Sequence, residues 1–174
     1  MKKLLLILST TLLGLGAAHA SFMIEPYVGL EKGTYSSGGA DIDFSGTDIG
    51  ARLGYSVLGF TFGADYMMAS MTEKPSGGDV KAKNTDMGVF AGYQFPIMLQ
   101  AYLTYFLSSE LDADNQSDNL KGSGTRIGVG YTGLPFVVIN FEMIKRTYTK
   151  LGSVDLSNDA KYDSYAINVS LPLP

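Results

Sequence analysis

Apolar and polar residues alternate with a period of two along most of the chain. In the mostly apolar stretch 49–69, one set of alternate residues is apolar, and the other set holds glycines, Arg52 and Asp65. Successive side chains of a β-strand point to opposite faces, so strands place both charges on one face, whereas a helix would not. The stretch therefore predicts two strands joined by a very short turn near residues 55–57, with the second strand read from Leu58.

Further segments carry the same alternation and bring the prediction to eight strands of roughly 9–11 residues, the length that a tilted strand needs to cross a bilayer. The predicted strands are 24–31, 48–55, 58–68, 86–95, 97–105, 124–131, 137–144 and 164–171.

The predicted connections alternate between tight and long. The tight turns lie around Ser56, around Phe95-Pro96 and at 132–134, and the long polar connections are 33–46, 70–84, 108–122 and 149–161. Alternating long and short connections are typical of outer-membrane barrels, in which the long loops are external and the short turns are periplasmic. Both termini are then expected on the periplasmic side.

The polarity of the two strand faces predicts an inverted barrel. One face is apolar along nearly every strand, and the other carries glycine, hydroxyl, amide and charged side chains. Because a closed barrel leaves no unpaired backbone edge in hydrocarbon, the fold class that we predict is all-β, an eight-stranded antiparallel up-and-down transmembrane β-barrel. A soluble lipocalin-like barrel is the structural alternative. The aromatic girdle expected at the tight-turn interface consists of Tyr55, Tyr93, Phe95 and Tyr131.

The first 20 residues have the features of a secretory signal peptide. Lys2 and Lys3 form a positive region, residues 4–16 are apolar, and residues 18–20 read Ala-His-Ala, which predicts cleavage after Ala20. The predicted domains are therefore a signal peptide at 1–20 and an outer-membrane β-barrel at 21–174.

Composition excludes several classes of function. Loss of Lys2 and Lys3 takes the formal charge from −4 to about −6, which argues against nucleic acid as a partner. His19 is the only histidine and the chain has no cysteine, so the mature protein lacks the usual general base, thiol nucleophile and transition-metal ligands. We therefore expect no catalytic site, no metal and no cofactor.

Charged residues on the polar face are expected to fill the lumen. The predicted interior network consists of Glu25, Asp48, Arg52, Asp65, Asp86, Arg126 and Glu142. Buried charges are costly unless paired, so we predict that Arg52 and Arg126 pair with some of Glu25, Asp65 and Glu142. A structural salt-bridge network is the preferred interpretation, and a narrow channel for ions or small solutes is an alternative. A third is a histidine-independent lipid-modifying enzyme, in which a pair such as Glu25 with Glu142 would act as an acid/base couple.

The third long connection has a weak resemblance to a calcium-binding loop. Asp112, Asp114, Gln116 and Asp118 have suitable offsets, but Ser117 stands where glycine is required, and the bidentate glutamate is missing. A solvated acidic loop is the preferred interpretation.

Several segments end in aromatic and glycine residues, namely PYVGLEKG, GARLGY, GVFAGYQF and RIGVGY. With the strand pattern, they resemble the small eight-stranded outer-membrane β-barrel family, the OmpA/OmpX-like transmembrane barrels. The resemblance implies a monomer in the outer membrane of a Gram-negative cell. It further implies lipopolysaccharide, outer-membrane lipid and the barrel assembly machinery as partners, and a structural or surface-interaction role. The chain departs from the family at its end, which reads SLPLP where an aromatic residue is common.

Overall fold

The computed structural model of the chain describes residues 20–37, 40–74, 78–113 and 118–173. Apart from Ala20, the predicted signal peptide lies outside these residues. Three of the residues weighed for the calcium loop, Asp114, Gln116 and Ser117, also lie outside them. Within the described ranges, no helix is long and apolar enough to cross a membrane.

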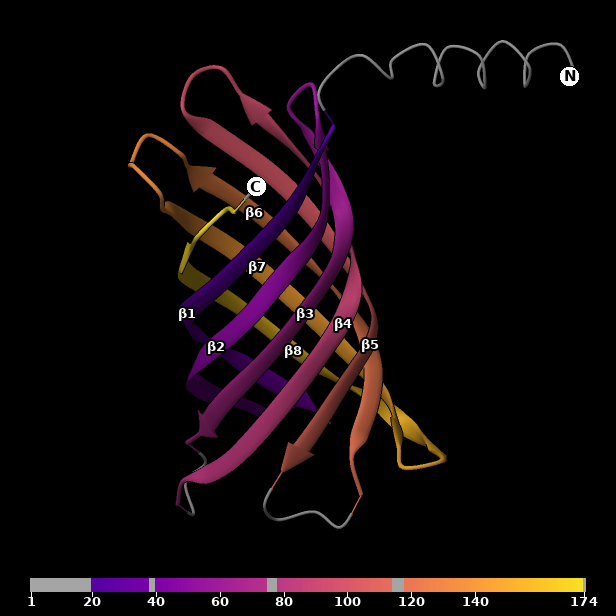
Figure 1. Cartoon of the computed structure of the whole chain (residues 1–174). Helices are drawn as coiled ribbons and strands as arrows, with labels where there is room; N and C mark the ends of the chain where they lie inside the picture. Colours follow the sequence, from indigo (N-terminus) through magenta and orange to yellow (C-terminus); the bar gives the residue numbers. More distant parts are fainter. Residues whose placement is uncertain (1–19, 38–39, 75–77, 114–117, 174) are drawn as a thin grey trace, which may run out of the picture.

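Eight antiparallel strands follow one another around a closed barrel, and β1 pairs with β8 to complete it (Figure 1). The strands are β1 Ser21–Ser37, β2 Ala40–Val57, β3 Phe60–Glu73, β4 Val80–Phe95, β5 Leu99–Ala113, β6 Leu120–Tyr131, β7 Val138–Leu151 and β8 Val154–Ser170. The predicted fold class is confirmed. The start of β1 and the end of β8 lie at one end of the barrel, here called the terminal end (Figure 1). The opposite end, with the β1–β2, β3–β4, β5–β6 and β7–β8 hairpins, is the far end.

The alternation along each strand sorts side chains between the lumen and the outer wall. On β1, Glu25 and Glu31 are buried in the lumen, whereas Val28 and Leu30 are 57% and 68% exposed on the outside. The outer wall of a soluble barrel is polar because it contacts water. An apolar wall around a polar lumen therefore indicates that the outside contacts hydrocarbon.

The strands are longer than predicted, and the predicted long connections are wrong as boundaries. β1 and β2 stay paired to Ser37 and Ala40, so only two residues connect them where residues 33–46 were expected to be a loop. In the same way, β3–β4, β5–β6 and β7–β8 pair through much of 70–84, 108–122 and 149–161. Outside the apolar belt the outer residues become polar, so the alternation of apolar with polar residues fades while the backbone pairing continues.

The first terminal-end turn lies later than predicted. Leu58 and Gly59 connect β2 to β3, with φ angles of 51° and 83°. Two successive positive φ angles are typical of the type I′ hairpin turn. The sequence placed this turn near residues 55–57 because Leu58, an apolar residue, continued the alternation of the next strand.

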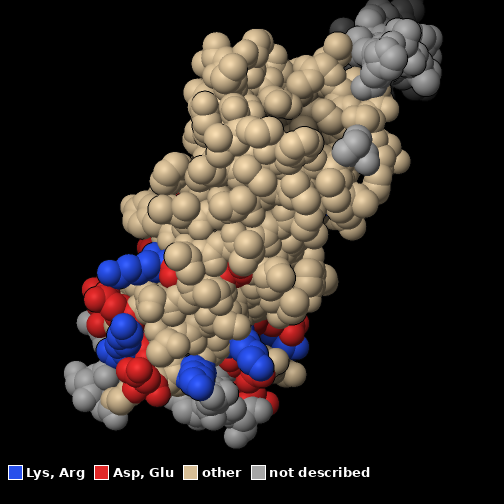
Figure 2. Space-filling model, turned by 60° about the vertical axis from the view of Figure 1, so that its left-hand side comes forward, with Lys and Arg blue, Asp and Glu red and all other residues tan. Residues whose placement is uncertain are grey.

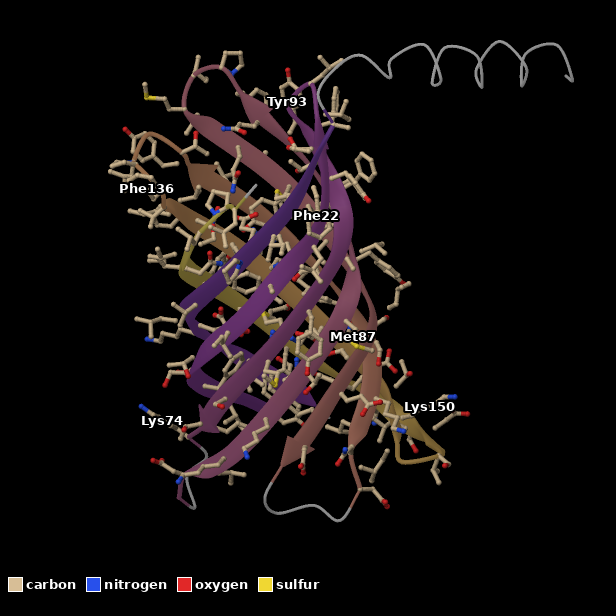
Figure 3. The ribbon with its side chains drawn as sticks, viewed as in Figure 1. Phe22, Lys74, Met87, Tyr93, Phe136 and Lys150 are labelled. Carbon is tan, nitrogen blue, oxygen red and sulfur yellow. The ribbon has the colours of Figure 1, made fainter. Side chains whose placement is uncertain are left out.

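Charged side chains are confined to the far part of the outer surface. On the face shown in Figure 2, Lys, Arg, Asp and Glu gather at the far end, and the rest of the wall has none. Figure 3 shows the same division: Phe22, Tyr93 and Phe136 lie toward the terminal end, Met87 lies on the middle of the wall, and Lys74 and Lys150 lie at the far end.

Candidate functional site: the charged interior

The first layer of charges in the lumen is set by strand register. Arg52 on β2 lies directly opposite Glu25 on β1 and Asp65 on β3. Its guanidinium pairs with Glu25 at 3.2 Å and lies 3.7 Å from Asp65, and it also reaches Glu142 on β7 at 2.8 Å. One arginine therefore links neighbouring strands to a strand on the other side of the lumen.

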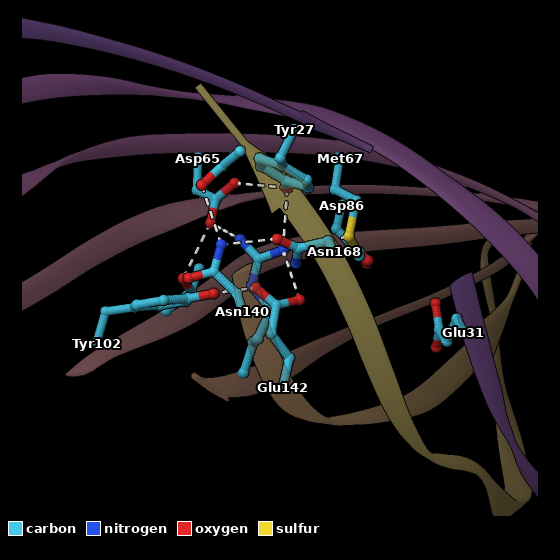
Figure 4. Close-up of polar contacts among 12 residues, drawn as sticks. Tyr27, Glu31, Asp65, Met67, Asp86, Tyr102, Asn140, Glu142 and Asn168 are labelled. Carbon is cyan, nitrogen blue, oxygen red and sulfur yellow. Dashed lines mark hydrogen bonds and ion pairs between the residues drawn. The ribbon is translucent and has the colours of Figure 1, made fainter. Parts of the chain in front are cut away.

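Arg126 on β6 makes a second link across the lumen. Its side chain is fully buried and pairs with Asp65, and it lies 3.6 Å from Glu142. It also donates a hydrogen bond of 2.9 Å to the Tyr27 hydroxyl, which in turn donates to Asp65 at 3.0 Å (Figure 4). Two arginines and three carboxylates form this central cluster.

Two tyrosines fill the space around the central cluster. The Arg52 guanidinium carbon lies 3.9 Å from the Tyr102 ring centroid and 4.9 Å from that of Tyr27, within the range of cation–π attraction. The rings fit because glycines face them. A Cβ at Gly128 would lie 2.2 Å from the Tyr102 ring, and one at Gly50 would lie 2.4 Å from the Tyr27 ring.

A second cluster lies nearer the far end and is centred on Arg146 of β7. Arg146 binds Glu31 through two nitrogens, at 2.6 and 3.2 Å, and donates to Asp86 at 2.9 Å. Ser109 and Ser164 donate to Asp86 and Glu31, respectively. Asp86, predicted in the network, thus pairs with an arginine that the prediction omitted. Continuing the alternation of β7 past residue 144 would have placed Arg146 and Tyr148 inside.

Asp48 is the exception among the predicted interior residues. It is 1% exposed, and neither carboxylate oxygen has a hydrogen-bond partner among the described residues. It lies against Gly29, where a Cβ would approach its oxygens to 2.8 Å. Because burial of a carboxyl group without a hydrogen-bond partner is unfavourable, we expect Asp48 to lower the stability of the barrel.

An apolar cluster lies in the lumen toward the far end. Its buried members are Phe44, Ala69, Met71, Ala82, Leu111, Leu120, Tyr148, Ala160 and Tyr162. Tyr162 stacks with Phe44 and Tyr148 at centroid distances of 5.3 and 5.5 Å, and its hydroxyl donates to Glu73. Burial, with the Glu73 carboxylate beside it, raises the pKa of Tyr162 above its usual value, so the phenol keeps the proton that it donates.

The terminal end of the lumen contains a cavity, here called the vestibule. A cavity of about 370 Å³ is lined by Phe90, Tyr102 and Leu173 among others, and it reaches Glu25 and Arg52. The vestibule therefore ends at the central cluster.

The residues predicted for the aromatic girdle lie at the terminal end. Tyr55, Phe95 and Tyr131 are 41–52% exposed on the outer wall, and Tyr93 is half-buried. Tyr93 packs against Phe60 and Phe95 at centroid distances of 4.7 and 5.0 Å. The four aromatic side chains thus lie together at the terminal end, and their role as an interfacial girdle stays a prediction.

The two glutamates considered for acid/base catalysis are both held by one arginine. Glu25 and Glu142, the pair considered for acid/base catalysis, both bind Arg52. Within the described ranges, no group of three or more His, Cys, Asp or Glu residues is arranged to hold a metal ion. The arrangement suits a structural network that joins opposite walls.

Comparisons with known proteins agree on architecture. No family model and no curated protein matches the sequence. Among solved structures, Neisserial surface protein A (NspA) shares 22% identity over 87% of this chain and 98% of that chain, with a TM-score of 0.56. Ail of Yersinia pestis, solved with the heparin analogue sucrose octasulfate, has a TM-score of 0.59 at 10% identity over 88% of this chain and 99% of that chain.

OprG of Pseudomonas aeruginosa has a TM-score of 0.51 at 13% identity, over 90% of this chain and 98% of that chain. These three proteins and this chain share the eight-stranded barrel as a fold. The chain has the architecture of the small eight-stranded outer-membrane β-barrels, the OmpA/OmpX-like group that its sequence resembles.

Proposed function

We propose that the protein is a monomeric, integral protein of the Gram-negative outer membrane, with a closed lumen and a structural or surface-interaction role. The observation that supports the proposal is the succession of buried side-chain layers inside the barrel. An eight-stranded barrel is just wide enough for side chains to fill it.

Three arginines and the apolar cluster at the far end occupy this narrow lumen. Arg52 and Arg126 join opposite walls in the first layer, and Arg146 reaches Asp86 across the lumen in the second. Tyr148 and Tyr162 belong to the apolar cluster at the far end. Opening a path would require the rupture of buried ion pairs, each of which leaves an unpaired charge in the lumen. These layers favour a structural network over the narrow channel.

The outer wall supports the membrane location. A strand of 18 residues, the longest here, spans roughly 60 Å, and a tilt of about 45° leaves a rise of roughly 42 Å. This exceeds the apolar band of about 25 Å that such barrels present to the membrane. The strands therefore continue beyond the membrane at the far end, where their paired extensions form the surface available for interaction.

Conductance measurements test the closed lumen. The purified protein in planar bilayers is expected to give no steady current steps, and Arg126→Ala is expected to give at most irregular noise. Steady steps in the wild type that are abolished by changes at Arg52 or Arg126 would establish the channel alternative. No enzymatic activity is expected, and unaltered lipid A after deletion of the protein would agree with this.

Single-cysteine labelling tests membrane location and orientation, because the chain has no native cysteine. Ser153→Cys, in the exposed β7–β8 hairpin, should react with an impermeant maleimide on intact cells. Leu134→Cys, in the β6–β7 turn at the terminal end, should react only after the outer membrane is permeabilised. The reverse pattern would refute the orientation, and a mature protein that stays soluble without detergent would refute the membrane location.

A further inference from the structure

Two grooves lie next to each other on the outer wall and share Thr47. The larger, about 790 Å³, crosses β7, β8, β1 and β2, and the smaller, about 350 Å³, crosses β1 to β4. Their apolar lining includes Leu30, Phe141 and Ile167 in the larger and Val28, Ile49 and Met68 in the smaller. The carboxylates that also border the grooves, Glu31, Glu142 and Asp48, have buried side chains. Both grooves therefore offer an apolar floor on the side of the wall that faces lipid.

Each groove also carries one lysine in its lining. Lys32 belongs to the larger groove and Lys83 to the smaller, and both side chains are exposed. The only lysine ion pair among the described residues is between Lys150 and Asp155, at 4.0 Å. Asp112 lies opposite Lys83 in the strand register but forms no ion pair with it. Both ammonium groups are thus available to an anionic ligand.

Hydroxyl side chains occupy the wall between the two lysines. Ser45 on β2 lies opposite Lys32, and Ser70 on β3 lies opposite Lys83 and also opposite Thr47. The lysines are three strands apart, which at about 4.8 Å per strand corresponds to roughly 14 Å across the sheet. The surface between them is short, polar and able to donate hydrogen bonds.

The grooves straddle the boundary of the apolar belt. Along β1 the outward residues change from Val28 and Leu30 to Lys32, and along β8 they change from Ile167 and Tyr165 to Asp163. In the orientation proposed above, this boundary lies at the headgroups of the outer leaflet, which in a Gram-negative outer membrane is lipopolysaccharide.

We propose that the two grooves bind the lipid A part of lipopolysaccharide. Acyl chains lie in the apolar floors, one phosphate meets Lys32 and the other meets Lys83, and the disaccharide crosses the hydroxyl side chains between them. Phosphatidylglycerol has one phosphate and two chains, so a single molecule can satisfy only one lysine and one groove. Diphosphoryl lipid A carries two phosphates and several acyl chains, so a single molecule can occupy both grooves and meet both lysines. The proposal rests on the outer-membrane orientation and is independent of whether the lumen conducts.

The test uses the mature protein folded in detergent micelles and titrated with three lipids: diphosphoryl lipid A, monophosphoryl lipid A and phosphatidylglycerol. Binding is read by native mass spectrometry. The variant is Lys32→Gln with Lys83→Gln, and its matched control is Lys121→Gln with Lys150→Gln, which removes the same charge elsewhere on the barrel. Thr47→Phe fills the shared part of the grooves without a change in charge, and Thr125→Phe on β6 is its control.

A lysine near an anionic membrane surface contributes about a fivefold gain in binding, so the Lys32/Lys83 variant should lose roughly 25-fold in affinity for diphosphoryl lipid A. Its loss for monophosphoryl lipid A should be smaller, and the control pair should bind as the wild type does. Equal wild-type affinity for phosphatidylglycerol and lipid A would overturn the proposal, as would an equal loss in the control pair. Every variant is first checked for the heat-dependent gel shift of the folded barrel; should Thr47→Phe fail to fold, the lysine variant still decides the outcome.

Discussion

Removal of the Arg126 guanidinium should strongly destabilise the barrel. Arg126 is fully buried and pairs with Asp65 and Glu142, so water cannot readily replace its guanidinium as their partner. In Arg126→Met the volume is largely kept, but Arg52 alone must then balance Glu25, Asp65 and Glu142. Breaking a buried ion pair by removing one partner costs about 3–5 kcal/mol, because a buried charge is left uncompensated. We expect a loss of this size in the free energy of unfolding.

The physical cause can be separated from a loss of packing by a second substitution. Asp65→Asn in the Arg126→Met background removes the Asp65 carboxylate, which has lost its arginine partner, so part of the lost stability should return. The expected coupling between the two sites is roughly 0.5–3 kcal/mol. Lys121→Met, at an exposed lysine on the same strand, is the control and should change stability by less than about 0.5 kcal/mol.

Reversible urea unfolding in lipid vesicles provides the assay. The chain has no tryptophan, so folding is followed by tyrosine fluorescence and by the heat-dependent gel shift. A loss below about 1 kcal/mol for Arg126→Met would refute the reasoning. Strict additivity of the two substitutions would refute it as well, since it would show that Asp65 does not depend on Arg126.

Three further predictions use the same assay. Asp48→Asn should leave stability unchanged or raise it, because it removes a buried charge that has no partner; a loss above about 1 kcal/mol would reveal a partner for the carboxylate. Gly128→Ala should destabilise by about 1–3 kcal/mol, since its Cβ would lie 2.2 Å from the Tyr102 ring; normal stability would mean that the ring moves freely. Leu58→Asn should raise the free energy of unfolding by a few tenths of a kcal/mol, because asparagine tolerates the positive φ of 51° better than leucine does. A lower unfolding midpoint for the variant than for the wild type would contradict this.

The phase of each strand could be predicted from sequence because the lumen and the lipid demand opposite polarities. Arg52 and Asp65 were assigned to the lumen on alternation alone, and both are buried there. The ends of the strands could not be predicted in this way. On β8, Lys161 and Asp163 point outward and Tyr162 points inward. There the polar residues lie on the outer face and the aromatic residue on the inner face, the reverse of the pattern that identified the strands.

The partners of the charges were also only partly predictable. Adjacent-strand pairs such as Glu25 with Arg52 follow from the register of a hairpin. Contacts across the lumen, such as Arg126 with Asp65, depend on the stagger and closure of the whole barrel, which no local pattern contains. Arg146 was missed for a simpler reason: the predicted strand ended at residue 144.

Closure of the sheet by β1 and β8 has a consequence for the kinetics of assembly. The hydrogen bond from Ser170 to Glu25 joins residues 145 positions apart, and the bond from Arg146 to Glu31 joins residues 115 positions apart. Neither contact can form until nearly all of the chain is in place. Non-local contacts slow folding, and an unclosed sheet would expose its edge strands to hydrocarbon. Membrane entry and ring closure are therefore expected to occur in one concerted, slow step, so hairpins should not accumulate as inserted intermediates.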